Sequence, residues 1–177
     1  MLARIRREVD AAEFEVKEHK GLKTELCSRS DRAVALLELL TNDPEFFEAV
    51  REITGCDRIG TFLGRVYRML PGPEHEDEWH GDLIKGRMVA MSVNLSEAPY
   101  SGGLLEIRDE HSKGVLHGIP NTGAGDAVIF RLARGLQHRV TAVEGAVPKT
   151  AYAGWFVPGP ESELLHPADF LSAAAVG

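Results

Sequence analysis

Cysteine is scarce in this chain, and its scarcity excludes two classes of small domain. The sequence has 177 residues and only two cysteines, Cys27 and Cys56. Two cysteines in a chain of this length do not form a disulfide framework, and neither has a second cysteine or a histidine at zinc-finger spacing. We therefore expect a reduced protein that is stabilised by an apolar core.

Long apolar stretches are also missing. No run of about 18 apolar residues is present, so the sequence predicts no transmembrane helix. The N-terminal stretch "MLARIRREVDAAEFEV" lacks the apolar segment that a signal peptide needs. Both absences favour a cytoplasmic protein that does not contact a membrane.

Positive charge is limited as well. The 20 Lys and Arg residues face 27 Asp and Glu residues, for a formal net charge of -7. Binding to nucleic acid requires clustered Lys and Arg, and the only basic run is the short "RIRREV". We expect no nucleic-acid partner. The hydrophobic content of 44% and the length are those of one ordinary globular domain.

The texture of the sequence changes near residue 60. Upstream, "SDRAVALLELLTN" and "DPEFFEAVREITGC" carry apolar residues at helical spacing, and Ser30 or Asp31 can cap the first of these helices. Downstream, short runs rich in Val, Ile and Phe alternate with Gly and Pro turns, which is typical of a β-sandwich or a closed β-barrel. The sequence therefore predicts an α+β, mainly β, fold with N-terminal helices packed on a β core.

We expect one domain overall, with three parts. An N-terminal helical support region would span residues 1–59, and the β core would span residues 60–160. Residues 161–177 would form a C-terminal tail that is either helical or frayed. No pattern in the sequence indicates an oligomeric state.

The stretch "WHGD" places an imidazole and a carboxylate two residues apart, as His80 and Asp82. In a strand, residues i and i+2 point to the same face, so both side chains would reach one point in space. A metal ion is the natural occupant of such a point, and a third ligand must come from elsewhere in the chain.

His138 is the best candidate for the third ligand. It belongs to the alternating stretch "HRVTAV", although a lone histidine at the start of a strand is more often structural. His75 lies in an acidic loop, and His111 and His117 lie in a turn-rich stretch. With His138, the set has two imidazoles and one carboxylate, the facial triad of non-heme Fe(II) oxygenases.

An ordered series of motifs then resembles the Fe(II)/2-oxoglutarate-dependent oxygenase superfamily, and within it the prolyl-hydroxylase-like branch. The series runs "LPG", "HGD", "GRMVAMSVNLS", "GGLLEI", "GDAVIF", "QHRV" and a basic residue before "WF", and it covers about residues 60–157. The resemblance implies a double-stranded β-helix (a cupin-like jelly roll) as catalytic core. It also implies Fe(II) held by His80, Asp82 and His138, with 2-oxoglutarate as cosubstrate and O2 as oxidant.

The resemblance also suggests which residues hold the cosubstrate. Lys149 matches the position of the cation that pairs with the far carboxylate of 2-oxoglutarate, where many members have Arg. Ala151 departs from the Ser or Thr that often stands two residues later. Asn94 falls where the animal oxygen-sensing prolyl hydroxylases have a Tyr that contacts 2-oxoglutarate. Matching "LPG" to the family turns Arg68 inward, toward substrate or cosubstrate.

Strand 87–95 has two faces of different character. One face is uniformly apolar and would pack in the core, so the other would line the pocket. The first face comprises Val89, Met91, Val93 and Leu95, and the second comprises Met88, Ala90, Ser92 and Asn94.

Asp82 bears on the reaction type, because halogenating members replace this carboxylate with a small residue. We therefore expect hydroxylation of an unactivated C–H bond in a peptidyl or free amino acid, or in a similar small metabolite. One alternative is a jelly-roll metalloenzyme of another class, a cupin-type isomerase or a cosubstrate-free dioxygenase that would recruit His75. The other is a non-catalytic binding module. The acidic run at 74–78 would be a solvated loop or a rim that favours a cationic substrate.

Overall fold

The computed structural model describes residues 1–19, 22–84, 86–120 and 123–159, so the expected tail at 161–177 lies outside the described residues. The N-terminal part contains three helices and one hairpin: α1 (Leu2–Asp10), β1 (Phe14–His19), β2 (Leu22–Ser28), α2 (Asp31–Thr41) and α3 (Pro44–Thr54). The rest is β-rich: β3 (Ile59–Met69), a 3-10 turn η1 (Pro73–His75), β4 (Val89–Asn94), β5 (Ser101–Gly102), β6 (Leu105–Asp109), β7 (Val115–Ile119), β8 (Ala127–Arg131), β9 (Leu136–Val140), β10 (Val143–Glu144) and β11 (Lys149–Pro158).

Helices α2 and α3 form where the local sequence supplies their ends. The Ser30 hydroxyl accepts a hydrogen bond from the backbone N–H of Ala33, which caps α2 as expected. Asp43 caps α3, Pro44 occupies its first turn, and Gly55 ends it with a left-handed backbone (φ 62°). The two predicted helices are therefore confirmed.

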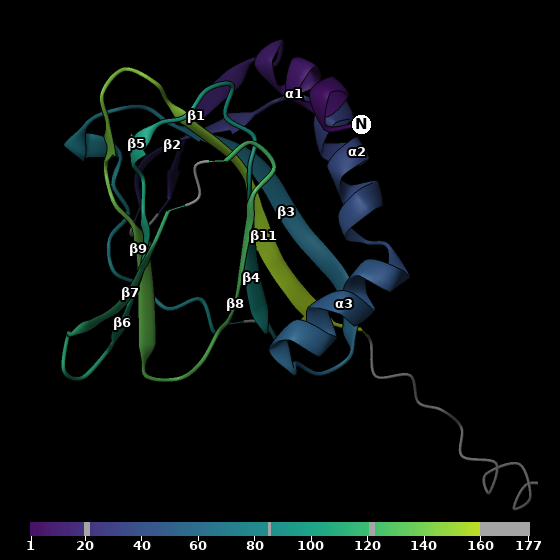
Figure 1. The fold of residues 1–177 in the computed structure, drawn as a ribbon, viewed down its shortest axis with the longest axis vertical. Helices are drawn as coiled ribbons and strands as arrows, with labels where there is room; N and C mark the ends of the chain where they lie inside the picture. The colour runs from purple at the N-terminus through teal and green to yellow at the C-terminus, as the bar shows by residue number, and fades with distance from the viewer. Residues whose placement is uncertain (20–21, 85, 121–122, 160–177) are drawn as a thin grey trace, which may run out of the picture.

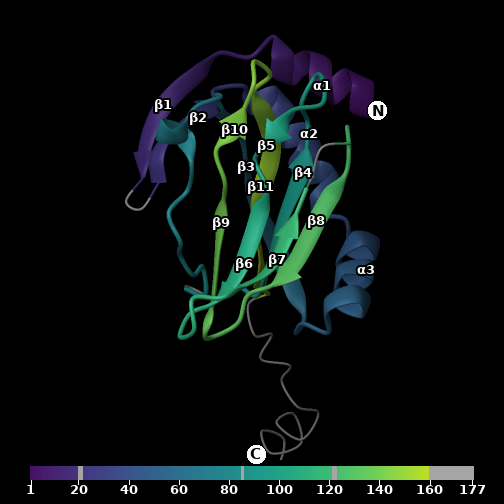
Figure 2. The same cartoon turned by 60° about the vertical axis from the view of Figure 1, so that its left-hand side comes forward.

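Two antiparallel sheets face each other. The major sheet has the order β1-β2-β3-β11-β4-β8, and the minor sheet has the order β7-β6-β9, with a short β10-β5 pair beside them. Figure 1 shows β6, β7 and β9 opposite the major sheet, and all three helices on the far face of that sheet. Figure 2, turned by 60°, shows the minor sheet in front of β11, β4 and β3. The expected mainly β fold with packed N-terminal helices is confirmed.

The main core lies between the helices and the major sheet. Strand alternation directs Phe62 of β3 and Tyr152 and Phe156 of β11 to this side, where all three are almost completely buried. Val9 of α1 and Val50 of α3 belong to the same buried cluster. The opposite face of the major sheet is therefore free to line the space between the two sheets.

The structure corrects two local expectations. Residues 81–84 form no strand, and His80 takes part only in an isolated bridge to His138. The turn-rich stretch around His117 contains the edge strand β7. Its side chains are mostly exposed, so no buried face identifies it as a strand. Within the described part of the chain, no helix is both long enough and apolar enough to cross a membrane.

Candidate metal centre

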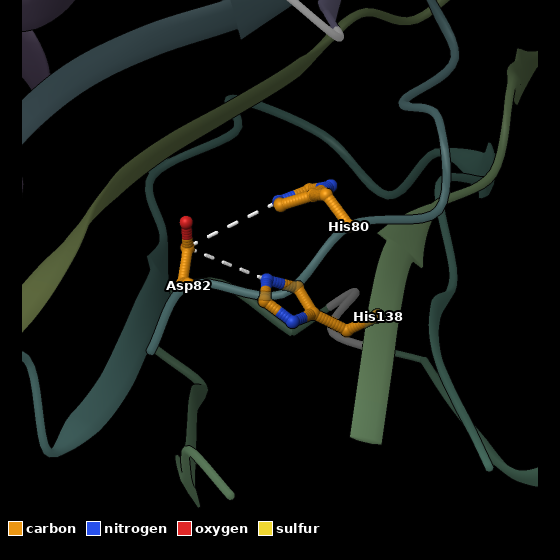
Figure 3. Close-up of side chains that lie close together, drawn as sticks. All are labelled: His80, Asp82 and His138. Carbon is orange, nitrogen blue, oxygen red and sulfur yellow. Dashed lines mark ion pairs between the residues drawn. The ribbon is translucent and has the colours of Figure 1, made fainter. Parts of the chain in front are cut away.

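His80, Asp82 and His138 come together between the two sheets. One potential ligand atom from each residue lies within 4.8 Å of the others. Nε2 of His138 lies 3.5 Å from Oδ2 of Asp82, and Nε2 of His80 lies 4.0 Å from the same oxygen. Figure 3 shows both rings pointing at the Asp82 carboxylate. The structure thus brings together the three residues that the sequence singled out.

Backbone pairing, rather than a continuous strand, sets this arrangement. The backbone N–H of His80 donates to the carbonyl of His138 (3.1 Å), and the N–H of His138 donates to the carbonyl of His80 (2.8 Å). The N–H of Asp77 also donates to the carbonyl of Val140. The loop segment 77–80 therefore lies along the free edge of β9 and places His80 beside His138.

The chemistry of this donor set fits Fe(II). Nδ1 of His80 lies 2.7 Å from the carbonyl oxygen of Glu78, which can only accept, so Nδ1 carries the proton. The lone pair of His80 is then on Nε2, which faces Asp82. Two imidazole nitrogens and one carboxylate on one side leave the other side open, as in the facial triad of Fe(II) oxygenases.

Two further side chains hold the Asp82 carboxylate. Nε1 of Trp155 donates to Oδ2 (2.6 Å), and Nη1 of Arg87 donates to Oδ1 (3.0 Å). Burial by itself would raise the pKa of Asp82, but hydrogen bonds from His138 and Trp155 outweigh it and hold the pKa below its usual value. Asp82 is therefore ionised at neutral pH, the state that a metal ligand requires.

A cavity of about 620 Å³ opens beside these three residues. Its volume is within the range of about 300–1,000 Å³ that is typical of small-molecule sites. The lining combines apolar side chains with ten charged or ionisable ones. The charged and ionisable lining residues are Glu25, Arg65, Tyr67, His75, Asp77, His80, Asp82, Arg87, His138 and Lys149.

Lys149 is the buried cation of this cavity. Its side chain is 2% exposed, and Nζ donates to the carbonyl of Gly103 (3.0 Å). Burial lowers the pKa of Lys149 to about 8, although the charge of Asp77 opposes that shift. Burial likewise raises the pKa of Asp77 to about 6. Lys149 and Asp77 are thus oppositely charged groups in the cavity lining, and each favours the ionised form of the other.

Arg68 does not point inward, so that expectation is wrong. The antiparallel register pairs Arg68 with Thr150, and Nε of Arg68 donates to the Thr150 hydroxyl (3.0 Å). Its guanidinium lies over the ring of Phe14, 4.1 Å from the centroid. Arg68 is two residues beyond Val66, which faces the helices, so alternation puts both on that face. Tyr67 lines the cavity instead.

Asn94 occupies a structural position at the end of β4. Its side-chain amide donates to the carbonyl of Gly123 (3.0 Å), and its oxygen accepts from the backbone N–H of Ser96 (2.9 Å). The described residues that line the cavity do not include Asn94. Ala90 and Ser92 do line it, and Val89 and Leu95 are buried in the main core as expected. Met91 belongs to the main core and also borders the cavity.

Three further histidines of the described residues, His75, His111 and His117, do not join the triad. His75 lines the cavity but is not part of any described group of three potential ligands. His111 and His117 are exposed. Sequence reasoning missed the contributions of Asp77, Arg87 and Trp155. Only Trp155 had a usable signal, because it shares the strand face of Lys149.

Comparison with known proteins agrees with this geometry. The model of a family described as the 2OG-Fe(II) oxygenase superfamily matches residues 64–157. No curated protein matches the sequence.

Several solved structures share the fold at low sequence identity. A Pseudomonas putida prolyl-4-hydroxylase superposes with a TM-score of 0.63 at 18% identity. The match covers 89% of this chain and 83% of the hydroxylase chain. A Burkholderia pseudomallei oxidoreductase of the 2OG-Fe(II) oxygenase family has a TM-score of 0.60 at 16% identity, with coverages of 88% and 78%. A Trichoplax adhaerens prolyl hydroxylase, solved with a peptide of hypoxia inducible factor, has a TM-score of 0.61 at 14% identity, with coverages of 88% and 76%. These likenesses confirm the jelly-roll fold.

Proposed function

The chain belongs to the 2OG-Fe(II) oxygenase superfamily, whose members use Fe(II), 2-oxoglutarate and O2, and from this premise we propose that it is a hydroxylase. The proposed substrate is a peptidyl or free amino acid, or a similar small metabolite. The enzyme would hydroxylate it at an unactivated C–H bond. The observation that carries the proposal is the convergence of His80, Asp82 and His138 at a cavity whose lining contains a buried lysine.

In the proposed site, Nε2 of both histidines and the Asp82 carboxylate would hold the iron. The iron, with 2-oxoglutarate and O2, supplies the oxidant for hydroxylation, and succinate and CO2 are the coproducts. Trp155 and Arg87 orient the Asp82 carboxylate, and the Glu78 carbonyl fixes the tautomer of His80. These contacts direct the Asp82 carboxylate and Nε2 of His80 at one point.

Lys149 is proposed to anchor the cosubstrate. A carboxylate gains most from a cation in a dry pocket, and Lys149 is almost fully buried. The Gly103 carbonyl takes one of its three N–H donors, so donors remain for a carboxylate. Arg68 is not proposed for this role, because it lies on the helix-facing side of β3.

Two of the structural neighbours favour an amino-acid side chain as substrate. Both are prolyl hydroxylases, and the Trichoplax enzyme was solved with a peptide. We extend the general substrate class, not proline itself, to this chain. The alternative of a cupin-type enzyme would need His75 as an additional ligand, and its ligand atoms are outside the described triad.

The proposal is tested by anaerobic titration of the metal-free protein with Fe(II) and then with 2-oxoglutarate. Chelation of the iron by the keto acid should produce a visible charge-transfer band that needs both components. Fe(II) binding without such a band would contradict the assignment of 2-oxoglutarate as cosubstrate. Absence of Fe(II) binding would contradict the assignment of the metal centre itself.

Variants separate the roles of the residues. Asp82→Ala should abolish the band and greatly weaken Fe(II) binding. Lys149→Ala should keep Fe(II) binding but weaken 2-oxoglutarate binding about 30-fold, which corresponds to the ~2 kcal/mol of a hydrogen bond to a charged group. Arg68→Ala is the matched control and should change neither affinity. A larger loss with Arg68→Ala than with Lys149→Ala would refute Lys149 as the anchor.

A further inference from the structure

The outer face of the minor sheet carries a cluster that the proposed chemistry does not use. We call it the outer-face clamp, and it consists of Trp79, Glu106, Arg108, Gln137 and Arg139. The guanidinium carbon of Arg108 lies 4.2 Å from the centroid of the Trp79 ring, and that of Arg139 lies 4.7 Å from it. Two cation–π contacts thus meet on one indole ring.

Both arginines of the clamp are held in place by cross-strand partners. Nε and Nη2 of Arg108 donate to Oε1 of Gln137, at 3.0 and 2.7 Å. Nε of Arg139 donates to Oε2 of Glu106, at 2.8 Å. These pairs are direct neighbours in the register of β6 and β9. Because the guanidinium groups are already ordered, stacking on Trp79 requires little further loss of side-chain freedom.

The clamp residues flank both candidate imidazole ligands in the sequence. Trp79 directly precedes His80, and Gln137 and Arg139 stand on either side of His138. Strand alternation sends the neighbours of an inward side chain outward, so the clamp and the ligands occupy opposite faces. In the same register, Ile107 pairs with His138, between Glu106 and Arg108.

The segment that carries His80 has few other restraints. Among the described residues between η1 and β4, no continuous strand or helix forms. The backbone bonds that tie segment 77–80 to β9 come from Asp77, His80 and His138. Stacking of Trp79 on Arg108 and Arg139 therefore adds a side-chain attachment on the outside of the same sheet.

We propose that Trp79 is a positioning residue for the metal centre, which fixes His80 relative to His138 by stacking on the ordered Arg108 and Arg139. This inference rests on the proposed iron site. It assigns Trp79 no contact with substrate, cosubstrate or metal. Partners that orient metal ligands typically contribute about 10- to 100-fold to metal affinity.

The test compares Fe(II) affinities under anaerobic conditions, with the d–d spectrum of bound Co(II) as a probe of ligand geometry. Trp79→Ala should bind Fe(II) about 10-fold more weakly and shift the Co(II) spectrum, while the metal-free protein keeps its far-UV circular dichroism. Trp79→Phe keeps an aromatic face for both arginines and should recover most of the affinity. Phe14→Leu is the matched control, because it removes an Arg–aromatic contact of 4.1 Å elsewhere in the fold.

The outcomes distinguish the clamp from the proposed function. Wild-type affinity in Trp79→Ala, or an equal loss in Phe14→Leu, overturns the positioning role while the metal centre stands. Failure of the wild-type protein to bind Fe(II) overturns the proposed function, and the clamp with it. Should Trp79→Ala not fold, Arg108→Met decides, since it removes one guanidinium and leaves the indole. About 3-fold weaker Fe(II) binding supports the clamp, and unchanged binding overturns it.

Discussion

At the scale of single residues, the burial of Lys149 has a consequence for pH. Its ammonium group sits in the cavity lining at 2% exposure, with a pKa lowered to about 8. A carboxylate bound beside it would favour the charged form and raise that pKa. The affinity for the cosubstrate is then greatest where Lys149 is already protonated, below pH 8.

We predict that 2-oxoglutarate binds more weakly as the pH rises above about 8, by up to about tenfold per pH unit. The reason is that the free protein must then take up a proton on Lys149 to bind. Asp77, with a pKa of about 6, stays ionised over this range and adds no slope. Anaerobic titrations of the iron-loaded protein between about pH 7 and 9.5 measure the effect.

Lys149→Arg is the control for this experiment. A guanidinium remains protonated throughout the range, so its profile should be flat apart from effects on the metal ligands. Identical profiles for the wild type and Lys149→Arg would mean that Lys149 does not hold the cosubstrate.

Arg68 and Asn94 show where residue-level prediction failed. Alternation from Val66 places Arg68 toward the helices, whereas the match of "LPG" to the family predicts an inward side chain. Asn94 was assigned to the correct strand end, yet its amide satisfies the backbone of Gly123 and Ser96. A short polar side chain at the end of a strand often hydrogen-bonds to the backbone of the following turn. The sequence is compatible with this structural role for Asn94.

At the scale of elements, β11 has a different task on each of its faces. Tyr152 and Phe156 pack in the main core, whereas Lys149 and Trp155 line the cavity. Strand β11 also lies between β3 and β4, so it contributes to both neighbours in the major sheet. A substitution that distorts β11 should therefore lower both the stability of the fold and the affinity for the metal.

Gly154→Ala tests this coupling. A Cβ on Gly154 would collide with the Leu63 carbonyl oxygen and with Cα of Gly64, and backbone atoms cannot yield as flexible side chains do. We expect a loss of about 2–3 kcal/mol in the free energy of unfolding, measured by urea denaturation, together with weaker Fe(II) binding. Gly118→Ala on β7 is the control, because nothing lies within 4 Å of its added Cβ. Equal stability of the two variants would show that β3 and β11 tolerate a wider spacing.

Element prediction succeeded where the periodic signal was strong. The apolar spacing of α2 and α3 and the runs of β3, β4 and β11 identified those elements from sequence alone. "WHGD" was predicted to be a strand because residues i and i+2 then share a face. In the structure a loop achieves the same convergence through its bridge to β9. The pairing of two segments distant in sequence has no local signature.

At the scale of the whole molecule, the N-terminal part and the β core share one apolar cluster. Val9 and Val50 from the helices pack in the same cluster as Phe62 and Phe156 from the sheet. The hairpin β1–β2 extends the major sheet, and Glu25 of β2 forms an ion pair with Arg65 of β3 at the cavity. We propose that residues 1–59 and 60–160 are one folding unit.

The corresponding prediction concerns unfolding. Far-UV circular dichroism, which reports the N-terminal helices, and tryptophan fluorescence, which reports Trp79 and Trp155, should give coincident urea transitions. Residues 60–160 alone should show no cooperative transition, because one wall of their core would be exposed to water. Two separated transitions in the full chain would instead mean that the N-terminal part folds independently.

The sequence by itself determined the secondary structure texture, the family and the three residues that gather at the candidate metal centre. These follow from local periodicity and from the order of motifs along the chain, which any sequence displays directly. Only the tertiary structure decided which faces point where and which distant residues meet. It directs Arg68 away from the cavity and places the charge of Asp77 where it acts on Lys149. It also brings Trp155 and Arg87 into hydrogen-bonding distance of Asp82. It also stacked Trp79 on Arg108 and Arg139. The physical reason is that such contacts depend on the register between strands far apart in sequence, and that register is set by the packing of the whole core.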